Sequence, residues 1–171
     1  MEGRDHGERL TSAEGVTLRR TERGDIAELH AFEMDAVSND MAGTKPRDWE
    51  TFRRRWELIL ADVDGSVTGV TPRVIMADGV MVGSVNVAPS EGRDAIGYRL
   101  ARVHWGRGIA TKAVALMLQE VGRRPLWATT DARNAASMRV LEKNGFAEIS
   151  REWTPETARG VARETVTLVL R

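Results

Sequence analysis

The chain has 171 residues, no cysteine, and 25 basic residues against 25 acidic ones. This balance argues against a general nucleic-acid binder, which usually has a basic excess, and the lack of cysteine excludes disulfides, thiolate nucleophiles and cysteine-ligated zinc. No apolar run approaches the roughly 20 residues that cross a bilayer, and the first residues lack the apolar stretch of a signal peptide. We therefore expect a cytoplasmic protein without a membrane or nucleic-acid partner. Residues 1–14 are expected to form a disordered polar tail, and residues 15–171 a single domain.

The order of the predicted elements indicates a mixed domain. In chain order we expect a strand at 16–20, a helix over 21–37, a loop at 38–46, a helix over 47–61, a hairpin over 73–88, a strand at 95–101, a helix over 110–122, a strand at 125–131, a helix over 134–145, and strands at 146–153 and 163–171. Asp78-Gly79 marks the hairpin turn, because this dipeptide tolerates positive φ angles. This order predicts an α/β (α+β) fold with a largely antiparallel sheet and one parallel step.

The helix expected over 47–61 carries an apolar stripe. Trp49, Phe52, Trp56 and Ile59 recur at three- and four-residue steps, which places them on one helical face. Packing into the core is the simpler interpretation of this stripe, and a wall of a substrate site is the alternative.

Residues 104–114, HWGRGIATKAV, place two glycines and two cations where a strand is predicted to become a helix. The first amides of a helix have no internal acceptor, and the helix dipole makes that end positive. Glycines keep side chains away from such amides, so Gly106 and Gly108 predict an anion site. The stretch matches neither GxxxxGK[ST] nor GxGxxG. A turn without a ligand remains the alternative.

Two segments of the chain resemble the GCN5-related N-acetyltransferase (GNAT) superfamily. Residues 105–110 resemble its pyrophosphate loop, Gln/Arg-x-x-Gly-x-Gly/Ala, with a tryptophan at the first position. Residues 134–146 reproduce the pattern N-x-x-S-x-R-V-L-x-K-x-G-F of its ribosomal-protein N-terminal acetyltransferase branch, which IGYRL at 96–100 also resembles. The resemblance covers about residues 94–148, and the remaining elements fit the same fold.

The resemblance implies a particular fold and an acetyl-coenzyme A site without a metal. The fold is a mixed, mostly antiparallel twisted sheet of six to seven strands, flanked by about four helices and splayed at its two central strands. The strand at 95–101 is expected to carry a bulge and to separate from 126–130, leaving room for the pantetheine arm. The implied coenzyme contacts are Leu100, Ala101, Arg102, Val103, Trp105, Gly106, Arg107, Gly108, Ile109, Ala110, Thr111, Asn134 and Ser137. For Asn134, a role as helix N-cap alone is the alternative.

The implied reaction moves an acetyl group from acetyl-CoA to a primary amine by direct attack in a ternary complex. The acceptor is a protein N-terminus or a small amine. The developing oxyanion needs a donor, for which the resemblance implies a backbone amide at 99–102. The departing thiolate needs a proton, and many relatives supply it from a tyrosine at the position of Leu141. Leucine has no such proton, so Ser137 is the preferred acid and Tyr98 an alternative.

The general base is less well defined by the sequence. Glu33 and Asp40 are the candidate bases, and a chain of water molecules is an equal alternative. His30 and His104 are expected to be structural or solvent-facing.

The motifs do not identify the acceptor amine. Substrate selection is expected in the loops at 37–48, 61–71 and 154–162, and a homodimer through the closing strands is left open. Two other functions remain as alternatives, a non-catalytic acetyl-CoA sensor on the same fold and a nucleotide-binding regulator that uses the glycine turn.

Overall fold

The computed structural model describes residues 15–171, and the predicted tail at 1–14 lies outside the described residues. The strands are β1 (Val16–Arg20), β2 (Thr71–Ala77), β3 (Val80–Ser90), β4 (Arg93–Leu100), β5 (Leu126–Asp131), β6 (Ala147–Thr154) and β7 (Arg163–Leu170). The helices are α1 (Ile26–Glu33), α2 (Ala36–Ala42), α3 (Trp49–Ala61), α4 (Ile109–Glu120) and α5 (Ala135–Lys143), with short 3-10 helices η1 (Arg23–Asp25) and η2 (Arg102–His104). Within residues 15–171, no helix is both long enough and apolar enough to span a membrane.

The seven strands form one sheet in the order β1-β2-β3-β4-β5-β7-β6. All neighbours are antiparallel except β4 and β5, which are joined through α4 and pair in parallel at the single position Ala95↔Trp127. Beyond that pair the two central strands separate, as the resemblance implies. The predicted mixed fold with a splayed sheet is confirmed.

The bulge expected in the strand at 95–101 is not found. The β3–β4 register runs without a shift from Gly83↔Leu100 to Ser90↔Arg93, and register shifts lie instead at Ile75/Met76 of β2 and at Glu148/Ser150 of β6. The opening between the central strands therefore arises because β5 stops pairing with β4, without an extra residue in β4.

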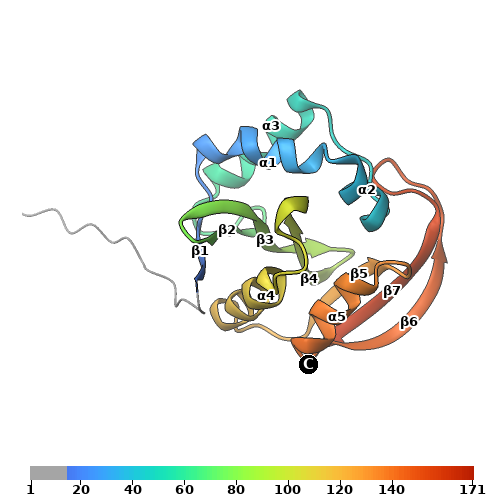
Figure 1. Ribbon diagram of the computed structural model, residues 1–171. Coiled ribbons are helices and arrows are strands. Elements are labelled where there is room, and N and C mark those ends of the chain that lie inside the picture. Colours follow the sequence, from blue (N-terminus) through green and yellow to red (C-terminus); the bar gives the residue numbers. More distant parts are fainter. Residues whose placement is uncertain (1–14) are drawn as a thin grey trace, which may run out of the picture.

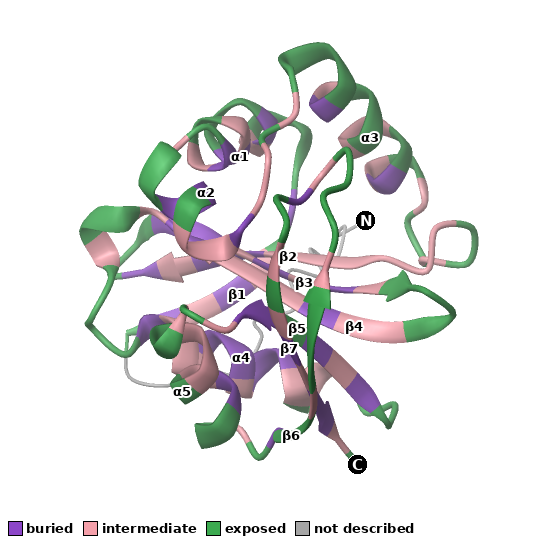
Figure 2. Cartoon of the chain, turned by 90° about the vertical axis from the view of Figure 1, so that its right-hand side faces the viewer, coloured by how far each residue is buried: buried purple, intermediate pink, exposed green. Residues whose placement is uncertain are grey.

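Helices cover both faces of the sheet (Figure 1). Successive strand residues point to opposite faces. Val74 of β2 therefore packs into a small core with α1 and α3, whereas its neighbour Ile75 packs into the larger core with α4 and α5. Figure 2 shows that the buried residues concentrate along the central strands and the inner face of α4. The loop predicted to hold the coenzyme therefore joins β4 of the sheet to α4, which packs into the larger core.

A helix replaces part of the loop predicted at 38–46. The predicted first helix ends at Glu33, and α2 follows from Ala36 to Ala42. The side chain of Asp35 caps α2 by accepting a hydrogen bond from the Ser38 amide at 2.7 Å, and Gly43 ends the helix at a φ of 63°. Cap residues at both ends of this short segment define the helix, although it has no apolar stripe.

The apolar stripe of α3 belongs largely to the core. Phe52 and Ile59 are buried, and Trp56 packs against the same cluster. His30 of α1 stacks against Phe52 and against the edge of Trp49, with ring centroids 5.0 and 5.3 Å apart. These contacts support core packing for the stripe and a structural role for His30.

Candidate functional site

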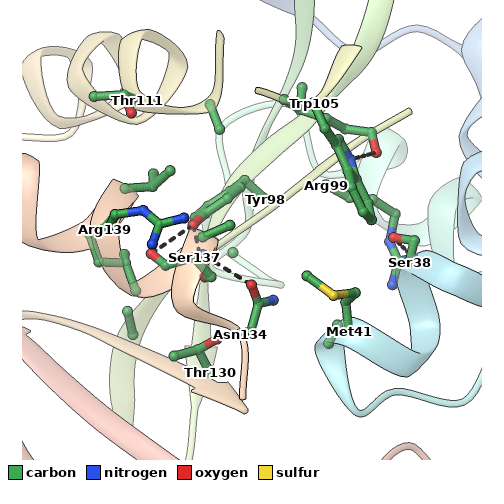
Figure 3. A pocket seen from close by; sticks show the side chains of 18 of the residues that line it. Ser38, Met41, Tyr98, Arg99, Trp105, Thr111, Thr130, Asn134, Ser137 and Arg139 are labelled. Carbon is green, nitrogen blue, oxygen red and sulfur yellow. Dashed lines mark hydrogen bonds between the residues drawn. The ribbon is translucent and has the colours of Figure 1, made fainter. Parts of the chain in front are cut away.

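A cavity of about 590 Å³ opens where β4 and β5 separate. One end lies against the N-terminus of α4 and one side of α5, and the other end lies against α2 (Figure 3). The polar and charged residues that line it are Ser38, Thr44, Tyr98, Arg99, His104, Trp105, Thr111, Thr129, Thr130, Asn134, Ser137, Arg139, Lys143 and Arg163.

The loop at the α4 end presents unbonded backbone amides. The first helical bond of α4 runs from the Lys112 amide to the Gly108 carbonyl at 3.2 Å, and the six amides from Gly106 to Thr111 have no acceptor among residues 15–171. Gly106 and Gly108 have φ angles of 75° and 74°, a left-handed conformation that favours glycine. A Cβ atom at either position would meet no atom within 4 Å, so backbone conformation and not crowding requires glycine here. The loop is therefore an array of donors at a positive helix end, which suits an anion.

The edge of β4 that faces the cavity also carries unpaired amides. Ala101 donates its amide to the Val82 carbonyl at 2.9 Å, so its amide points toward β3. Because strand amides alternate in direction, those of Tyr98 and Leu100 point toward β5, where pairing has already ended. Of the predicted stretch 99–102, Leu100 thus supplies the amide that faces the cavity.

Trp105 connects the loop to the end of β4. Its indole Nε1 donates a hydrogen bond to the Leu100 carbonyl at 3.0 Å (Figure 3), and the residue is 36% exposed. A tryptophan N–H that is partly buried usually finds such a partner. The departure from the family pattern at this position therefore has a structural role, which is to anchor the loop.

The two candidate acids, Tyr98 and Ser137, meet in the cavity (Figure 3). The Tyr98 hydroxyl lies 2.9 Å from Ser137 Oγ and 3.3 Å from the Ser137 carbonyl. Burial raises the pKa of Tyr98, and the hydrogen bond with Ser137 lowers it only in part. Both hydroxyls are therefore protonated at neutral pH and able to share a proton. Leu141, at the position of the missing tyrosine, is 1% exposed and belongs to the core.

Asn134 has the capping role that the sequence left as an alternative. Its side chain accepts a hydrogen bond from the Ser137 amide at 3.0 Å and begins α5. The residue also lines the cavity, so capping does not remove it from the site.

The other predicted coenzyme contacts divide into two groups. Those that line the cavity are Leu100, Trp105, Gly106, Gly108, Ile109, Ala110, Thr111, Asn134 and Ser137. Ala101, Arg102, Val103 and Arg107 do not line it. The guanidinium of Arg102 pairs with Asp35 and that of Arg107 with Asp78, each at 3.5 Å.

Glu33 lies away from the other candidate catalytic residues. It is 8% exposed and does not line the cavity. Its carboxylate accepts hydrogen bonds from the Arg47 amide at 2.8 Å, from the Arg47 guanidinium at 3.1 and 3.2 Å, and from Arg159 at 3.1 Å. These donors occupy the oxygens that a base would use, so Glu33 instead joins α1 to two later loops. Asp40 is exposed on α2 and also lies outside the lining.

The structure adds four cations to the site that the sequence did not assign. Arg139 and Lys143 come from α5, one helical turn apart within the matched motif. Arg99 comes from β4 and Arg163 from β7. Arg139 and Lys143 could have been found from the sequence, because they belong to the motif at 134–146 and are four residues apart on a helix. Arg99 and Arg163 are brought together only by the fold.

Comparisons with known proteins agree with this geometry. Residues 16–147 match the family described as an acetyltransferase (GNAT) domain. No functionally curated protein sequence matches the chain.

Solved structures resemble the whole domain. RimL, a ribosomal L7/L12 alpha-N-protein acetyltransferase in complex with coenzyme A, is 18% identical with a TM-score of 0.76, covering 95% of this chain and 97% of that one. RimJ of Mycobacterium smegmatis, in complex with CoA-disulfide, is 25% identical with a TM-score of 0.70 over 91% and 81% of the two chains. Spermidine N-acetyltransferase of Vibrio cholerae, in complex with CoA and spermine, is 17% identical with a TM-score of 0.76 over 92% and 96%. Because the family match spans most of the described residues, the chain belongs to the GNAT family of acetyltransferases.

Proposed function

We propose that this protein moves an acetyl group from acetyl-CoA to a primary amine by direct attack in a ternary complex. The observation that carries the proposal is the run of six amides from Gly106 to Thr111 that have no acceptor among the described residues, beside an open edge of β4. Structural neighbours in complex with coenzyme A or acetyl-CoA support it.

The chain's own residues suit the parts of acetyl-CoA. The amides of 106–111 would hold the diphosphate at the positive end of α4, and Arg139 and Lys143 add charge nearby. The Tyr98 amide on β4 would pair with the pantetheine arm between the separated strands. Acetyl-CoA supplies a thioester, whose carbonyl carbon an amine can attack without a covalent enzyme intermediate.

Three groups would serve the chemical step. The Leu100 amide donates to the oxygen that gains negative charge during transfer. Ser137 holds a proton at Oγ for the departing sulfur, and Tyr98, 2.9 Å behind it, replaces that proton. In place of the tyrosine of many relatives, Ser137 of α5 would act as the acid, with support from Tyr98 of β4.

Water would accept the proton that the amine loses. No aspartate or glutamate is among the described residues that line the cavity, and Glu33 is held by Arg47 and Arg159. Of the alternatives left by the sequence, this favours a chain of water molecules over Glu33 or Asp40 as the base.

Replacement of Gly108 by glutamate tests the loop. A side chain and a negative charge at this position would meet the bound diphosphate, so Gly108→Glu should abolish acetyl-CoA binding in calorimetry. The matched control is Gly92→Glu, because Gly92 has a φ of 75°, equally open surroundings and a place in the β3–β4 turn outside the lining. Both variants carry a similar backbone strain of about 1–2 kcal/mol. Equal acetyl-CoA affinity in the two variants would refute the assignment of the loop.

Removal of the Ser137 hydroxyl tests the acid. Ser137→Ala should lower kcat about a hundredfold with little change in KM, because the proton is needed only as the thiolate departs. Tyr98→Phe should lower kcat less, since Ser137 retains its own proton. Free-thiol release in single-turnover assays measures both, with the exposed Ser90→Ala as control. Unchanged turnover in Ser137→Ala would move the acid role to water or Tyr98, and binding without turnover in the wild type would identify a sensor.

A further inference from the structure

The α2 end of the cavity is lined by arginines. Arg139 lies toward the α4 end, where the diphosphate is proposed to bind, and Lys143 precedes Asn144, which bonds to the Thr111 carbonyl of α4. Arg99 lies at the opposite end beside Ser38 and Met41 of α2 (Figure 3). No described lining residue is acidic. The proposed coenzyme site accounts for the first two cations and leaves Arg99 without an assigned role.

Arg99 is held by neutral acceptors only. Its guanidinium donates to Ser38 Oγ at 2.9 Å, to Thr44 Oγ1 at 3.2 Å and to the Phe32 carbonyl at 3.5 Å, and it forms no ion pair within residues 15–171. Glu33 and Asp35 act on it electrostatically, but Glu33 is bonded to two other arginines, and Asp35 caps α2 and pairs with Arg102. Burial accordingly lowers the pKa of Arg99. A partly buried charge without a partner is costly unless a ligand supplies one.

Arg163 adds a second, independent observation. Its Nη1 donates to the Gly43 carbonyl at 2.8 Å and the Val161 carbonyl at 3.1 Å, and its buried Nε has no acceptor among residues 15–171. Asp131 acts on it electrostatically, yet this carboxylate accepts its hydrogen bonds from Arg133. Arg163 therefore places a second guanidinium in the cavity wall that forms no ion pair with a carboxylate of residues 15–171.

Two loops hold both arginines in place. The segment after α2 pairs with the β6–β7 loop through Val161 N to Gly43 O at 3.0 Å and Lys45 N to Arg159 O at 2.9 Å. Arg99 and Arg163 then bond to adjacent residues of this segment, Thr44 and Gly43. These are two of the three loops expected to select the substrate. The third, at 61–71, borders a separate cavity of about 280 Å³.

We propose that the acceptor amine carries an anionic group, a carboxylate or a phosphate, that binds Arg99 and Arg163 at the α2 end of the cavity. This inference rests on the proposed acetyl transfer and narrows its substrate. Guanidinium groups bind both anions in paired hydrogen bonds. A polycation such as spermine would meet four cations and no carboxylate in the described lining, so polyamines are disfavoured acceptors.

Matched probes that differ only in the anionic group test the inference. The pairs are phenylalanine with 2-phenylethylamine, O-phosphoethanolamine with ethanolamine, and a Ser-Asp-Gly amide with a Ser-Asn-Gly amide; spermine is added as a polycation. Calorimetry on the CoA-saturated protein should show the anionic member of at least one pair binding about tenfold to a hundredfold more tightly. The pair that shows the difference identifies the kind of anion and its carrier.

Variants of the two arginines localise the effect. Arg99→Gln and Arg163→Gln should each remove the preference while CoA affinity stays at the wild-type value, which also shows that the fold is intact. In thiol-release assays, KM for the anionic acceptor should rise with little change in kcat. Arg54→Gln is the matched control, because Arg54 is an exposed arginine of α3 that pairs with Glu50 outside the cavity.

The outcomes separate this inference from the proposed function. Equal or tighter binding of the neutral members or of spermine, or no binding of any anionic probe at millimolar concentration, would overturn the inference and leave acetyl transfer standing. An unchanged preference in both arginine variants would also overturn it. Failure of the wild type to bind CoA or acetyl-CoA would instead refute the proposed function itself.

Discussion

At the scale of single residues, Asp131 shows how one carboxylate shapes the site without lining it. It is 1% exposed at the end of β5 and accepts hydrogen bonds from the Arg133 amide and guanidinium at 2.8 to 3.1 Å. Its carbonyl accepts the Asn134 amide at 2.9 Å, directly before α5 begins. Burial alone would raise the pKa of Asp131, but the hydrogen bonds from Arg133 outweigh it and hold this pKa below its usual range.

The depressed pKa of Asp131 predicts a particular pH dependence. Since the folded pKa lies below the unfolded value of about 3.9, ionised Asp131 stabilises the fold above that pH, and the stabilisation is lost as pH falls through the folded pKa. Arg133→Ala leaves the buried carboxylate poorly compensated, so the midpoint of acid unfolding should move to higher pH. Urea unfolding at a series of pH values measures this, with Arg54→Ala as control. An acid midpoint equal to that of the wild type would contradict the prediction.

At the scale of elements, α5 contributes residues from its start to its end to the lining of the cavity. Asn134 caps it, Ser137 faces Tyr98 of β4, and Arg139 and Lys143 reach the coenzyme end. Helical spacing groups Asn134 with Ser137 and Arg139 with Lys143, and all four residues line the cavity. A change that disturbs the start of α5 therefore affects both folding and the proposed coenzyme contacts.

Substitutions of Asn134 can separate its two roles. Serine caps helices about as well as asparagine, so Asn134→Ser should keep the stability while losing the amide donor, and acetyl-CoA binding should weaken about tenfold. Asn134→Ala should lose the same affinity and in addition about 1 kcal/mol of stability. Thermal unfolding and calorimetry measure the two effects. Wild-type affinity in Asn134→Ser would restrict the residue to its capping role.

At the scale of the whole molecule, the sheet is continuous except between β4 and β5. Cores on both faces support the flanking strands, so the split can persist and leave the β4 edge open for a ligand. Edge amides that are left unpaired in this way are suited to pairing with an extended chain.

Binding of acetyl-CoA between β4 and β5 should raise the thermal stability of the whole domain and slow hydrogen exchange at the binding site. Acetyl-CoA at 100 times its Kd should stabilise the fold by about 2.7 kcal/mol, which corresponds to a rise in Tm of roughly 5–10 °C for a domain of this size. Hydrogen exchange should slow at the amides of 106–111 and at Leu100, and remain unchanged in the β3–β4 turn. A higher Tm without protection of the loop would place the ligand elsewhere.

Much of the fold was predictable because its signals are local. Alternating strands, the Asp78-Gly79 turn and the cap of α5 each depend on a few neighbouring residues. α2 was missed because its seven residues are too few to show the apolar periodicity that indicates a helix, and its caps, Asp35 and Gly43, lie in a stretch rich in turn-forming residues.

The sequence by itself indicated the family and the amide loop, because glycines at a helix start permit the left-handed backbone that leaves such amides open. Tertiary structure decided the rest of the site. It placed Glu33 among arginines instead of in the cavity, brought Tyr98 to Ser137, and set Arg99 and Arg163 against one segment. Charge and hydrogen bonding between residues far apart in the chain depend on distance in space, which only folding establishes.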